Sequence, residues 1–379
     1  MSFKQHTAIY LSVLFITLSS CGTPEAQQSE QVSDIDKFKT FAVDPLVKSS
    51  SIFDAIEEVE ILGLEETAGS LLSFATSTNV TQDKVIFRNG NKDELYIYSK
   101  KGEFIDKINS QGDGPEEYGR LSSFWVNDNK IQIHDGPGTK INSYDLQGNL
   151  LTQNKLPEFY TSIRGYKDSY IADVSRTIVQ DSLRFSIAFP ELDSYSIPIK
   201  RQKKTSVIWL TSRFSRYEDN VLYTPTYGDT VYMIKDNAAS PLLSVDFGEK
   251  WLWKDVDLYD NVQAQRQAMA PDGMVNMFMP IISKRKMLFT IVKRGNGLFL
   301  VDRISGGFKR FDLNKKGEGK YSLQAQNWDG DKAIFSIGSD QIGDFLMELG
   351  EEKAKFLGNA SLKSIENSEN PVLIWVKFK

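Results

Sequence analysis

The sequence has few of the residues that most enzymes use for chemistry at neutral pH. Its 379 residues include one Cys and two His. A single Cys excludes a disulfide within the chain. Zinc catalysis is excluded as well, because a zinc site takes several His or Cys ligands. A Ser-His-Asp triad would require a His as its base, and only His134 lies outside the N-terminal segment.

An excess of positive charge is also missing. Lys and Arg number 45 and Asp and Glu number 50, which gives a formal net charge of −5. The mean field of such a protein repels phosphate, so we expect no nucleic-acid partner. The remaining composition, with 40% hydrophobic and 25% charged residues, is typical of a globular protein.

Long hydrophobic runs are lacking except near the N-terminus. There, Lys4 precedes an apolar run from Ala8 to Leu18, which has the length of a signal-peptide core and is too short to span a bilayer. The run ends in Leu18-Ser19-Ser20-Cys21-Gly22, which resembles a bacterial lipobox. We therefore predict a lipoprotein signal peptide over residues 1–20 and lipid attachment at Cys21. The alternative is a free Cys beside an ordinary secretory cleavage site.

A polar segment follows the predicted lipid site. Residues 21–40 are expected to form a flexible tether, since Val32 is the only large apolar residue between Gly22 and Ser33. Acyl chains on Cys21 would anchor this tether to a membrane. Gly22, rather than Asp, follows the Cys, and this favours the outer membrane. Whether the protein faces the periplasm or the cell surface is left open.

Short β-type runs dominate the rest of the chain. They are rich in β-branched and aromatic residues and are bounded by Gly, Asn and Asp, which is typical of strands and hairpins. The clearest runs are Val85–Phe87, Leu95–Tyr98, Ile131–Ile133, Thr230–Ile234, Leu298–Val301 and Ala333–Ser336. One helical insertion is expected over Asp255–Met269, because Pro271 stops the pattern.

A repeat relates two parts of this β-rich region. Val85 aligns with Ile131 and Tyr98 with Tyr144 at one constant offset, and a degenerate copy lies between Leu298 and Phe311. A period of about 45 residues with several strands is typical of a propeller blade. A sandwich would not give this long-range register, and a β-helix has a shorter period. The C-terminal strand Pro371–Phe378 is placed to close the ring.

Several motifs resemble those of one known family. The segments are Gly112–Tyr118 (GDGPEEY), Asp229–Ile234 (DTVYMI), Val245–Gly248 (VDFG) and Glu369–Leu373 (ENPVL). Together with the lipobox, they resemble the six-bladed β-propeller lipoproteins of Bacteroidota, which are related to NHL-type and TolB-like propellers. The resemblance implies an all-β, six-bladed propeller of four-stranded antiparallel blades over residues 41–379. It implies an envelope location rather than a reaction.

The loop Gly112–Tyr118 has two interpretations. Its glycines and Pro115 suit a turn between blades, with Tyr118 as a plug in the core. In the functional interpretation, Asp113, Glu116, Tyr118 and Arg120 lie at the mouth of the central channel and contact a ligand.

Three further residues are candidate ligand contacts. Trp251 and Trp253 would share one face of a strand and could stack on a sugar ring or a partner protein. Core packing is the alternative role for both. His134 follows the alternating run Ile131–Ile133 and is either an ordinary residue at a strand end or a contact.

No catalytic residue, metal or cofactor is predicted. Calcium remains an alternative at Asp329–Asp331 or Asp255–Asp257, because calcium takes oxygen ligands, although such pairs are usually polar turns. The sialidase Asp box and phosphate-binding Gly-rich loops are missing from the sequence.

These observations favour a binding role over catalysis. We expect a membrane-anchored envelope lipoprotein whose propeller binds a partner protein or a glycan, with a link to nutrient uptake. The alternative is a carboxylate- or calcium-dependent propeller enzyme, such as a lyase, lactonase or glycan hydrolase. An acidic cluster at one mouth of the channel would favour the enzyme, and an apolar plug would favour the binding module.

Overall fold

The computed structural model describes most of the chain beyond the predicted tether. The described residues are 35–379 without 91, 128, 138, 158, 161, 168, 175–186, 190–193, 197–213, 226–227, 255–272, 292–296 and 312–322. Cys21 and the predicted helix Asp255–Met269 lie outside these residues. Lys37–Lys379 form one unit, which is described here by itself.

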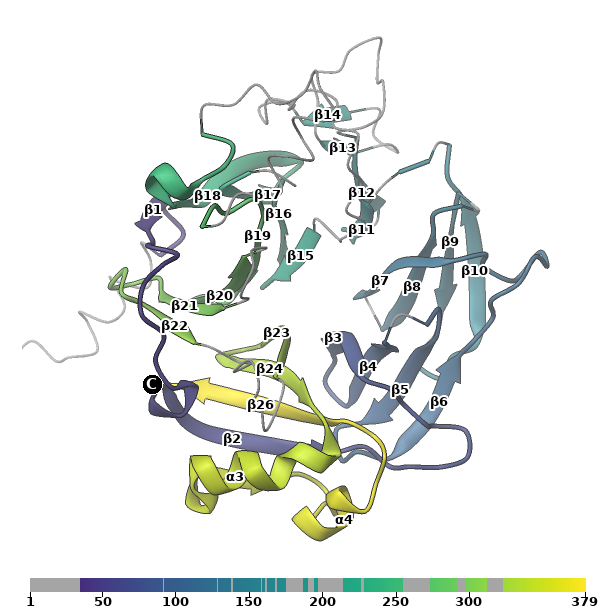
Figure 1. Ribbon diagram of the computed structural model, residues 1–379. Coiled ribbons are helices and arrows are strands. Elements are labelled where there is room, and N and C mark those ends of the chain that lie inside the picture. Colours follow the sequence, from purple (N-terminus) through teal and green to yellow (C-terminus); the bar gives the residue numbers. More distant parts are fainter. Residues whose placement is uncertain are drawn as a thin grey trace, which may run out of the picture. The chain divides into compact units, whose positions relative to one another are not determined.

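The described strands pair into six sheets that surround a central axis (Figure 1). Sheet 1 contains β3 (Ala75–Val80), β4 (Lys84–Asn89), β5 (Leu95–Ser99) and β6 (Phe104–Ile108). Sheet 2 contains β7 (Leu121–Asn127), β8 (Lys130–Asp135), β9 (Lys140–Tyr144) and β10 (Leu150–Lys155). Sheet 3 contains β11 (Ser162–Tyr166), β12 (Ser169–Asp173), β13 (Ile187–Phe189) and β14 (Ser194–Ser196).

The other three sheets complete the ring. Sheet 4 contains β15 (Phe214–Tyr217), β16 (Asn220–Tyr223), β17 (Thr230–Lys235) and β18 (Ala238–Asp246). Sheet 5 contains β19 (Phe278–Ile282), β20 (Lys286–Ile291), β21 (Leu298–Asp302) and β22 (Phe308–Phe311). Sheet 6 contains β23 (Gln324–Asp329), β24 (Lys332–Ile337), β26 (Val372–Phe378) and β2 (Ile56–Gly63).

Two short strands extend the outer edges of this ring. β1 (Lys39–Ala42) pairs in parallel with β18, and β25 (Ala354–Phe356) pairs in parallel with β2. The four main strands of each sheet are antiparallel to their neighbours and follow one another outward from the axis. The chain is therefore an all-β propeller with four-stranded blades, as the sequence predicts.

The repeat is confirmed at the level of strand register. Val85 lies opposite Tyr98 in sheet 1, and Ile131 lies opposite Tyr144 in sheet 2. The turns after these strand pairs also match, because Gly102 and Gly148 have φ angles of 86° and 89°. A side chain is strained at such angles, which explains why both copies of the turn carry Gly.

Hydrophobic clusters fill the spaces between adjacent sheets. Ile86 and Ile97 of sheet 1 pack with Ile131 and Ile133 of sheet 2 in one cluster. In sheet 5, the rings of Phe289 and Phe299 stack with centroids 4.9 Å apart. The middle strands of these sheets therefore bury side chains on both faces, and each buried apolar side chain contributes about 1.5 to 3 kcal/mol.

Closure of the ring joins the two ends of the described chain. β26 lies between β24 and β2, and it is antiparallel to both. The expected pairing of the C-terminal strand with the other end of the chain is thereby confirmed. β1 begins at Lys39, just before the predicted propeller boundary at residue 41.

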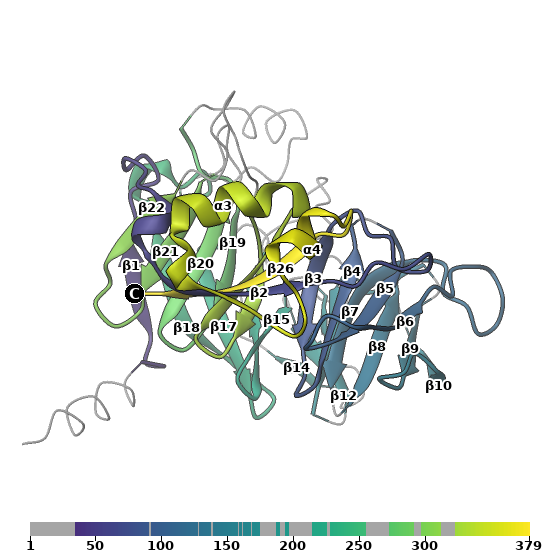
Figure 2. The same ribbon diagram turned by 90° about the horizontal axis from the view of Figure 1, so that it is seen from below.

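Helices cover the outer side of sheet 6 (Figures 1 and 2). α3 (Ile342–Leu349) buries Phe345 and Leu346 in the same cluster as Val59 of β2 and Ile374 of β26. The other helices are α4 (Leu362–Glu366) and the 3₁₀ turns η1 (Ile52–Asp54), η3 (Gly248–Lys250), η5 (Ser339–Gln341) and η6 (Glu351–Lys353). Among the described residues, no helix is long and apolar enough to cross a membrane.

Candidate functional site

A cavity of about 570 Å³ lies where the innermost strands of all six sheets converge. These strands are β3, β7, β11, β15, β19 and β23. Its lining includes Thr78 of β3, Ser123 of β7, Arg164 of β11, Ser215 of β15, Met279 of β19 and Gln326 of β23. The volume is in the range of small-molecule sites. This central channel is the candidate functional site.

The channel lining mixes Ser, Thr, Asn and Gln side chains with many apolar side chains, among them Leu121, Phe124 and Met279. Met279 is 37% exposed although it belongs to an inner strand. A wall that combines hydroxyls and amides with apolar side chains suits a hydroxylated ligand, because it offers both hydrogen bonds and contact surface. An acidic cluster, which would favour the enzyme, does not form among the described lining residues.

Three arginines carry the charge of the channel. Arg88, Arg164 and Arg216 line it, and the described lining contains no Asp or Glu. Burial lowers the pKa of Arg164 to about 10, and the nearby guanidinium of Arg216 lowers it as well. Arg164 still carries its charge at pH 7. The channel therefore has a positive potential within a chain whose net charge is −5.

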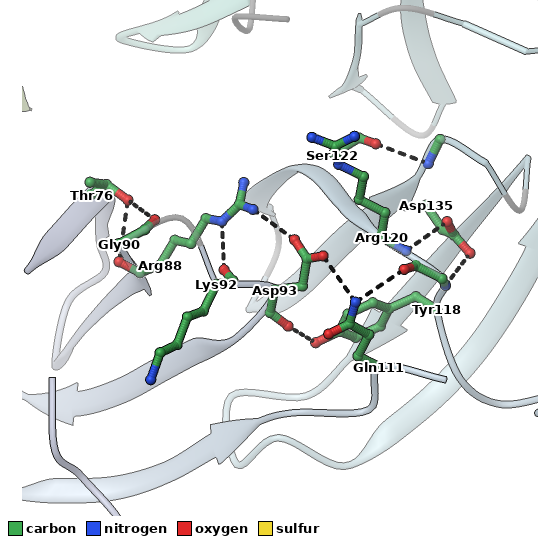
Figure 3. Close-up of polar contacts among 12 residues, drawn as sticks. Thr76, Arg88, Gly90, Lys92, Asp93, Gln111, Tyr118, Arg120, Ser122 and Asp135 are labelled. Carbon is green, nitrogen blue, oxygen red and sulfur yellow. Dashed lines mark hydrogen bonds and ion pairs between the residues drawn. The ribbon is translucent and has the colours of Figure 1, made fainter. Parts of the chain in front are cut away.

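Arg88 is held at one side of the channel by its own sheet (Figure 3). Its Nε donates to the Lys92 carbonyl at 2.7 Å, and its Nη2 donates to Asp93 Oδ1 at 2.7 Å. Burial lowers the pKa of Arg88, Asp93 raises it, and Arg120 lowers it. The ion pair with Asp93 neutralises this arginine, so Arg164 and Arg216 carry the uncompensated charge.

The loop Gly112–Tyr118 connects β6 to β7 as a compact turn. The Gly114 N–H donates to Glu117 Oε2 at 2.7 Å, and the Lys140 ammonium donates to the Glu117 carbonyl. A Cβ on Gly112 would lie 2.0 Å from Glu117 Oε2, so Gly112 leaves room for this carboxylate. The loop conformation thus depends on contacts of its own backbone and of sheet 2.

Tyr118 fixes this loop to the core. Its side chain is completely buried, and its hydroxyl donates to the Asp93 carbonyl at 2.5 Å (Figure 3). Burial raises the pKa of its phenol. The next two N–H groups, those of Gly119 and Arg120, donate to the Asp135 carboxylate at 2.9 and 3.2 Å. This geometry is that of a blade-connecting turn, with Tyr118 as its plug.

The predicted contacts of this loop do not line the cavity. Asp113, Glu116 and Arg120 are exposed, and none of them belongs to the channel lining. Arg120 lies near the channel arginine Arg88, since its charge lowers the pKa of that residue. The structure therefore brings only Arg120 close to the channel and leaves Asp113 and Glu116 on the outer surface of the loop.

His134 lies inside β8 and is only 1% exposed. It shares a face of this strand with Gln132, whose Oε1 accepts from the Trp125 indole at 2.8 Å. Neither ring nitrogen of His134 has a hydrogen-bond partner within the part of the chain that is described. Burial lowers its pKa to about 4, although Asp135 raises it. His134 is thus a neutral core residue at pH 7.

The tryptophan pair does not share a strand face. Trp251 and Trp253 follow η3, and Trp251 forms one isolated bridge with Val275. Trp251 stacks on Phe247 with centroids 5.5 Å apart, and the Trp253 indole donates to the Asn276 carbonyl at 2.6 Å. Both rings pack against the cluster between sheets 4 and 5. Neither ring lines the channel.

The carboxylates considered for calcium do not converge in the described structure. Asp329 Oδ2 accepts from the Trp375 indole at 3.1 Å and lies 3.9 Å from Lys100 Nζ. No group of three or more His, Cys, Asp and Glu is placed to hold a metal among the described residues. Asp255–Asp257 lie outside the described residues.

The fold and the channel define a β-propeller with a basic axial cavity. The chain belongs to a domain family of unknown function, DUF4934, whose family model matches residues 35–377. No curated protein matches the sequence.

Two solved structures are similar to the chain to different degrees. A protein of Bacteroides fragilis NCTC 9343 that is described as exported is 17% identical, with a TM-score of 0.70 over 90% of this chain and 100% of that chain. A member of the DUF4221 family from Bacteroides vulgatus ATCC 8482 is 11% identical, with a TM-score of 0.47 over 86% of this chain and 97% of that chain. The likeness to the Bacteroides fragilis protein, at 17% identity, concerns the fold alone.

Proposed function

We propose that the chain is an exported, lipid-anchored binding protein whose central channel holds a soluble glycan. The observation that carries this proposal is the axial cavity of about 570 Å³, to which the inner strands of all six sheets contribute side chains. A rigid ring of strands gives such a site a fixed shape, which reduces the entropy lost when a ligand binds. Hydroxyl and amide groups in the wall match the hydrogen-bonding groups of a sugar.

The proposal treats each of the six sheets as one blade. In support, each sheet has four antiparallel strands and places one of them at the axis. The parallel strands β1 and β25 are additions to the outer edges. Sheet 6 is the closing blade, because it combines strands from both ends of the described chain.

Export and anchoring rest on the N-terminal sequence. The apolar run and the lipobox-like Leu18–Gly22 segment support cleavage before Cys21 and acylation of that residue. The description of the Bacteroides fragilis relative as exported agrees with this assignment. We place the protein at the outer membrane, where the tether would carry the propeller away from the lipid surface. A role in nutrient uptake follows if the glycan is then passed to an importer.

The test compares two substitutions of the same kind at different places. Met279→Trp fills the channel, because Met279 lines it and is partly exposed there. Met347→Trp is the matched control, since Met347 lies on α3 and is 76% exposed. The mature chain with Cys21→Ala, which keeps it free of lipid, is applied to a glycan array, and hits are measured by calorimetry.

We expect glycan binding that Met279→Trp weakens at least about tenfold and Met347→Trp leaves unchanged. A chain that binds no glycan on the array, or binds equally well with Trp at position 279, would contradict the proposal. Turnover of a bound glycan would instead identify the channel as an active site.

A further inference from the structure

We infer that the channel recognises its ligand through an anionic group, held between Arg164 and Arg216. This inference rests on the proposed function and assigns the chemical class of the ligand. The group is a carboxylate, sulfate or phosphate on a hydroxylated molecule, such as a uronic acid or a sulfated sugar.

The two arginines face one cavity from neighbouring sheets. Arg164 lies in the middle of β11 of sheet 3, and Arg216 lies in β15 of sheet 4. These two inner strands are in contact, and both residues line the channel. Their guanidinium groups lie close enough that the charge of Arg216 lowers the pKa of Arg164.

This arrangement is unfavourable for the protein alone. Two like charges lie close together, Arg164 partly buried and Arg216 exposed, and the described lining has no carboxylate to compensate them. The Arg216 Nε donates to the Glu218 carbonyl at 3.1 Å. Among the described residues, the Arg164 guanidinium and the Nη groups of Arg216 have no hydrogen-bond acceptor. An anion would supply acceptors to both residues and would remove their repulsion.

Neither of the nearby acidic residues, Glu218 and Asp93, compensates the charge of Arg164 and Arg216. The Glu218 carboxylate forms an ion pair with Lys284 at 3.2 Å and is not part of the channel lining. Asp93 is likewise engaged with Arg88 at 2.7 Å. The charge of both acidic side chains is therefore matched elsewhere.

The shape of the guanidinium group explains why an oxyanion is expected. Its planar fork donates two parallel hydrogen bonds to a carboxylate, sulfate or phosphate. Ser123 and Ser215, which also line the channel, would contribute hydroxyl donors and acceptors beside it. The low dielectric of a cavity strengthens these interactions relative to the same contacts at the surface.

Arginines retained for binding have a different effect on stability from structural arginines. Replacing a structural Arg removes contacts and lowers stability. Replacing Arg164 by Met removes repulsion and a partly buried charge, so we expect an unchanged or higher urea midpoint. Functional groups commonly have this property, because they are selected for the ligand rather than for the fold.

The experiment measures simple anions first and sugars second. Sulfate, phosphate and acetate are titrated at low ionic strength into the lipid-free mature chain by calorimetry. Glucuronate, glucose 6-sulfate and glucose 6-phosphate are then compared with neutral glucose. The variants are Arg164→Met, Arg216→Met and Arg164→Lys, and Arg285→Met is the control that removes the same charge from an exposed turn outside the channel.

We expect charged sugars to bind about ten- to a hundredfold more tightly than glucose. Added salt should weaken the binding of the charged sugars. Each Met variant at position 164 or 216 should lose most of this preference. Arg164→Lys should retain part of it, and Arg285→Met should behave as the wild type. The three charged sugars distinguish the possible anionic groups of the ligand. Preference for glucuronate indicates a uronic acid, and preference for an ester indicates a sulfated or phosphorylated sugar.

Two results would overturn the inference. One is that charged probes bind the wild-type chain no more tightly than glucose. The other is that their binding persists when Arg164 and Arg216 are both Met. If neutral glycans bind and Met279→Trp blocks them in either case, the inference fails and the proposed function stands. If Met279→Trp changes no binding at all, the proposed function fails.

Discussion

Trp375 lies directly opposite Glu60, although the two residues belong to the last and the second strand of the described chain. This pairing closes sheet 6 and therefore the ring. The Trp375 side chain is 4% exposed, and its indole donates to Asp329 Oδ2 at 3.1 Å. One residue of the C-terminal strand β26 thus contacts both β2 and the inner hairpin of the closing sheet.

Substitution of this tryptophan should weaken the whole propeller. Trp375→Ala is expected to lower the free energy of unfolding by about 3 to 5 kcal/mol, because it leaves a cavity at the closure. Urea unfolding followed by circular dichroism measures this change. Trp375→Phe keeps most of the packing and should lose less. A chain that ends before Pro371 should show no cooperative transition, and normal unfolding of that chain would refute closure by β26.

His134 should make stability depend on pH. Burial lowers its pKa from 6.5 to about 4, so the unfolded chain takes up a proton before the folded chain does. The contribution of the neutral His134 ring to the free energy of unfolding is fully present above pH 6.5 and is lost as the pH falls toward 4. The shift corresponds to about 3 kcal/mol at most.

The comparison is made with His134→Leu, which cannot titrate. The difference in unfolding free energy between this variant and the wild type should grow in favour of the variant between pH 6.5 and pH 4. It should level off below pH 4, where both states of the wild type are protonated. A difference that stays constant across this range would mean that His134 is not buried as a neutral ring.

Tyr118 should be important for stability through its hydroxyl as well as its ring. Tyr118→Phe removes the hydrogen bonds to the carbonyls of Asp93 and Ile108, at 2.5 and 3.4 Å. We expect a loss of about 1 to 2 kcal/mol, since the partly buried Asp93 carbonyl loses its donor. Tyr118→Ala should cost about 3 to 5 kcal/mol. Unfolding midpoints of the two variants that coincide with the wild type would show that the loop is not fixed by this plug.

The proposed lipid site gives a direct prediction. Cys21→Ala should abolish incorporation of labelled fatty acid in cells and should release the protein into the soluble fraction. Ser20→Ala keeps a small residue beside the cleavage point and should still be labelled. Label that persists after Cys21→Ala would place the acyl group elsewhere.

The strand pattern and the closure could be read from the sequence, but the channel could not. The runs around Val85 and Ile131 repeat because equivalent buried strands need apolar residues at the same positions. The pairing register is also equivalent, since Val85 lies opposite Tyr98 and Ile131 lies opposite Tyr144. Arg164 and Arg216, by contrast, lie in short inner strands that lack a clear apolar alternation. Their meeting depends on how two sheets are placed around the axis, which no local pattern encodes.

Trp251 and Trp253 pack in the core, as one of the two interpretations predicts, but they do not share a strand face. Spacing of two residues implies a shared face only within a strand, whereas Trp251 and Trp253 lie in a turn after η3. The loop before Tyr118 is distinctive in the sequence because of its Gly and Pro residues. Those residues serve the turn itself, as the contacts of Glu117 with Gly114 and Lys140 show.

The position of β26 between β24 and β2 also constrains when the molecule can finish folding. Its residues are made after those of every other described strand, yet β2 has no antiparallel partner in sheet 6 until they arrive. On the ribosome, the ring therefore stays open while all the other described strands are made, and the late pairing is of very long range. If the chain is secreted as proposed, this delay helps to keep it threadable through a translocation pore.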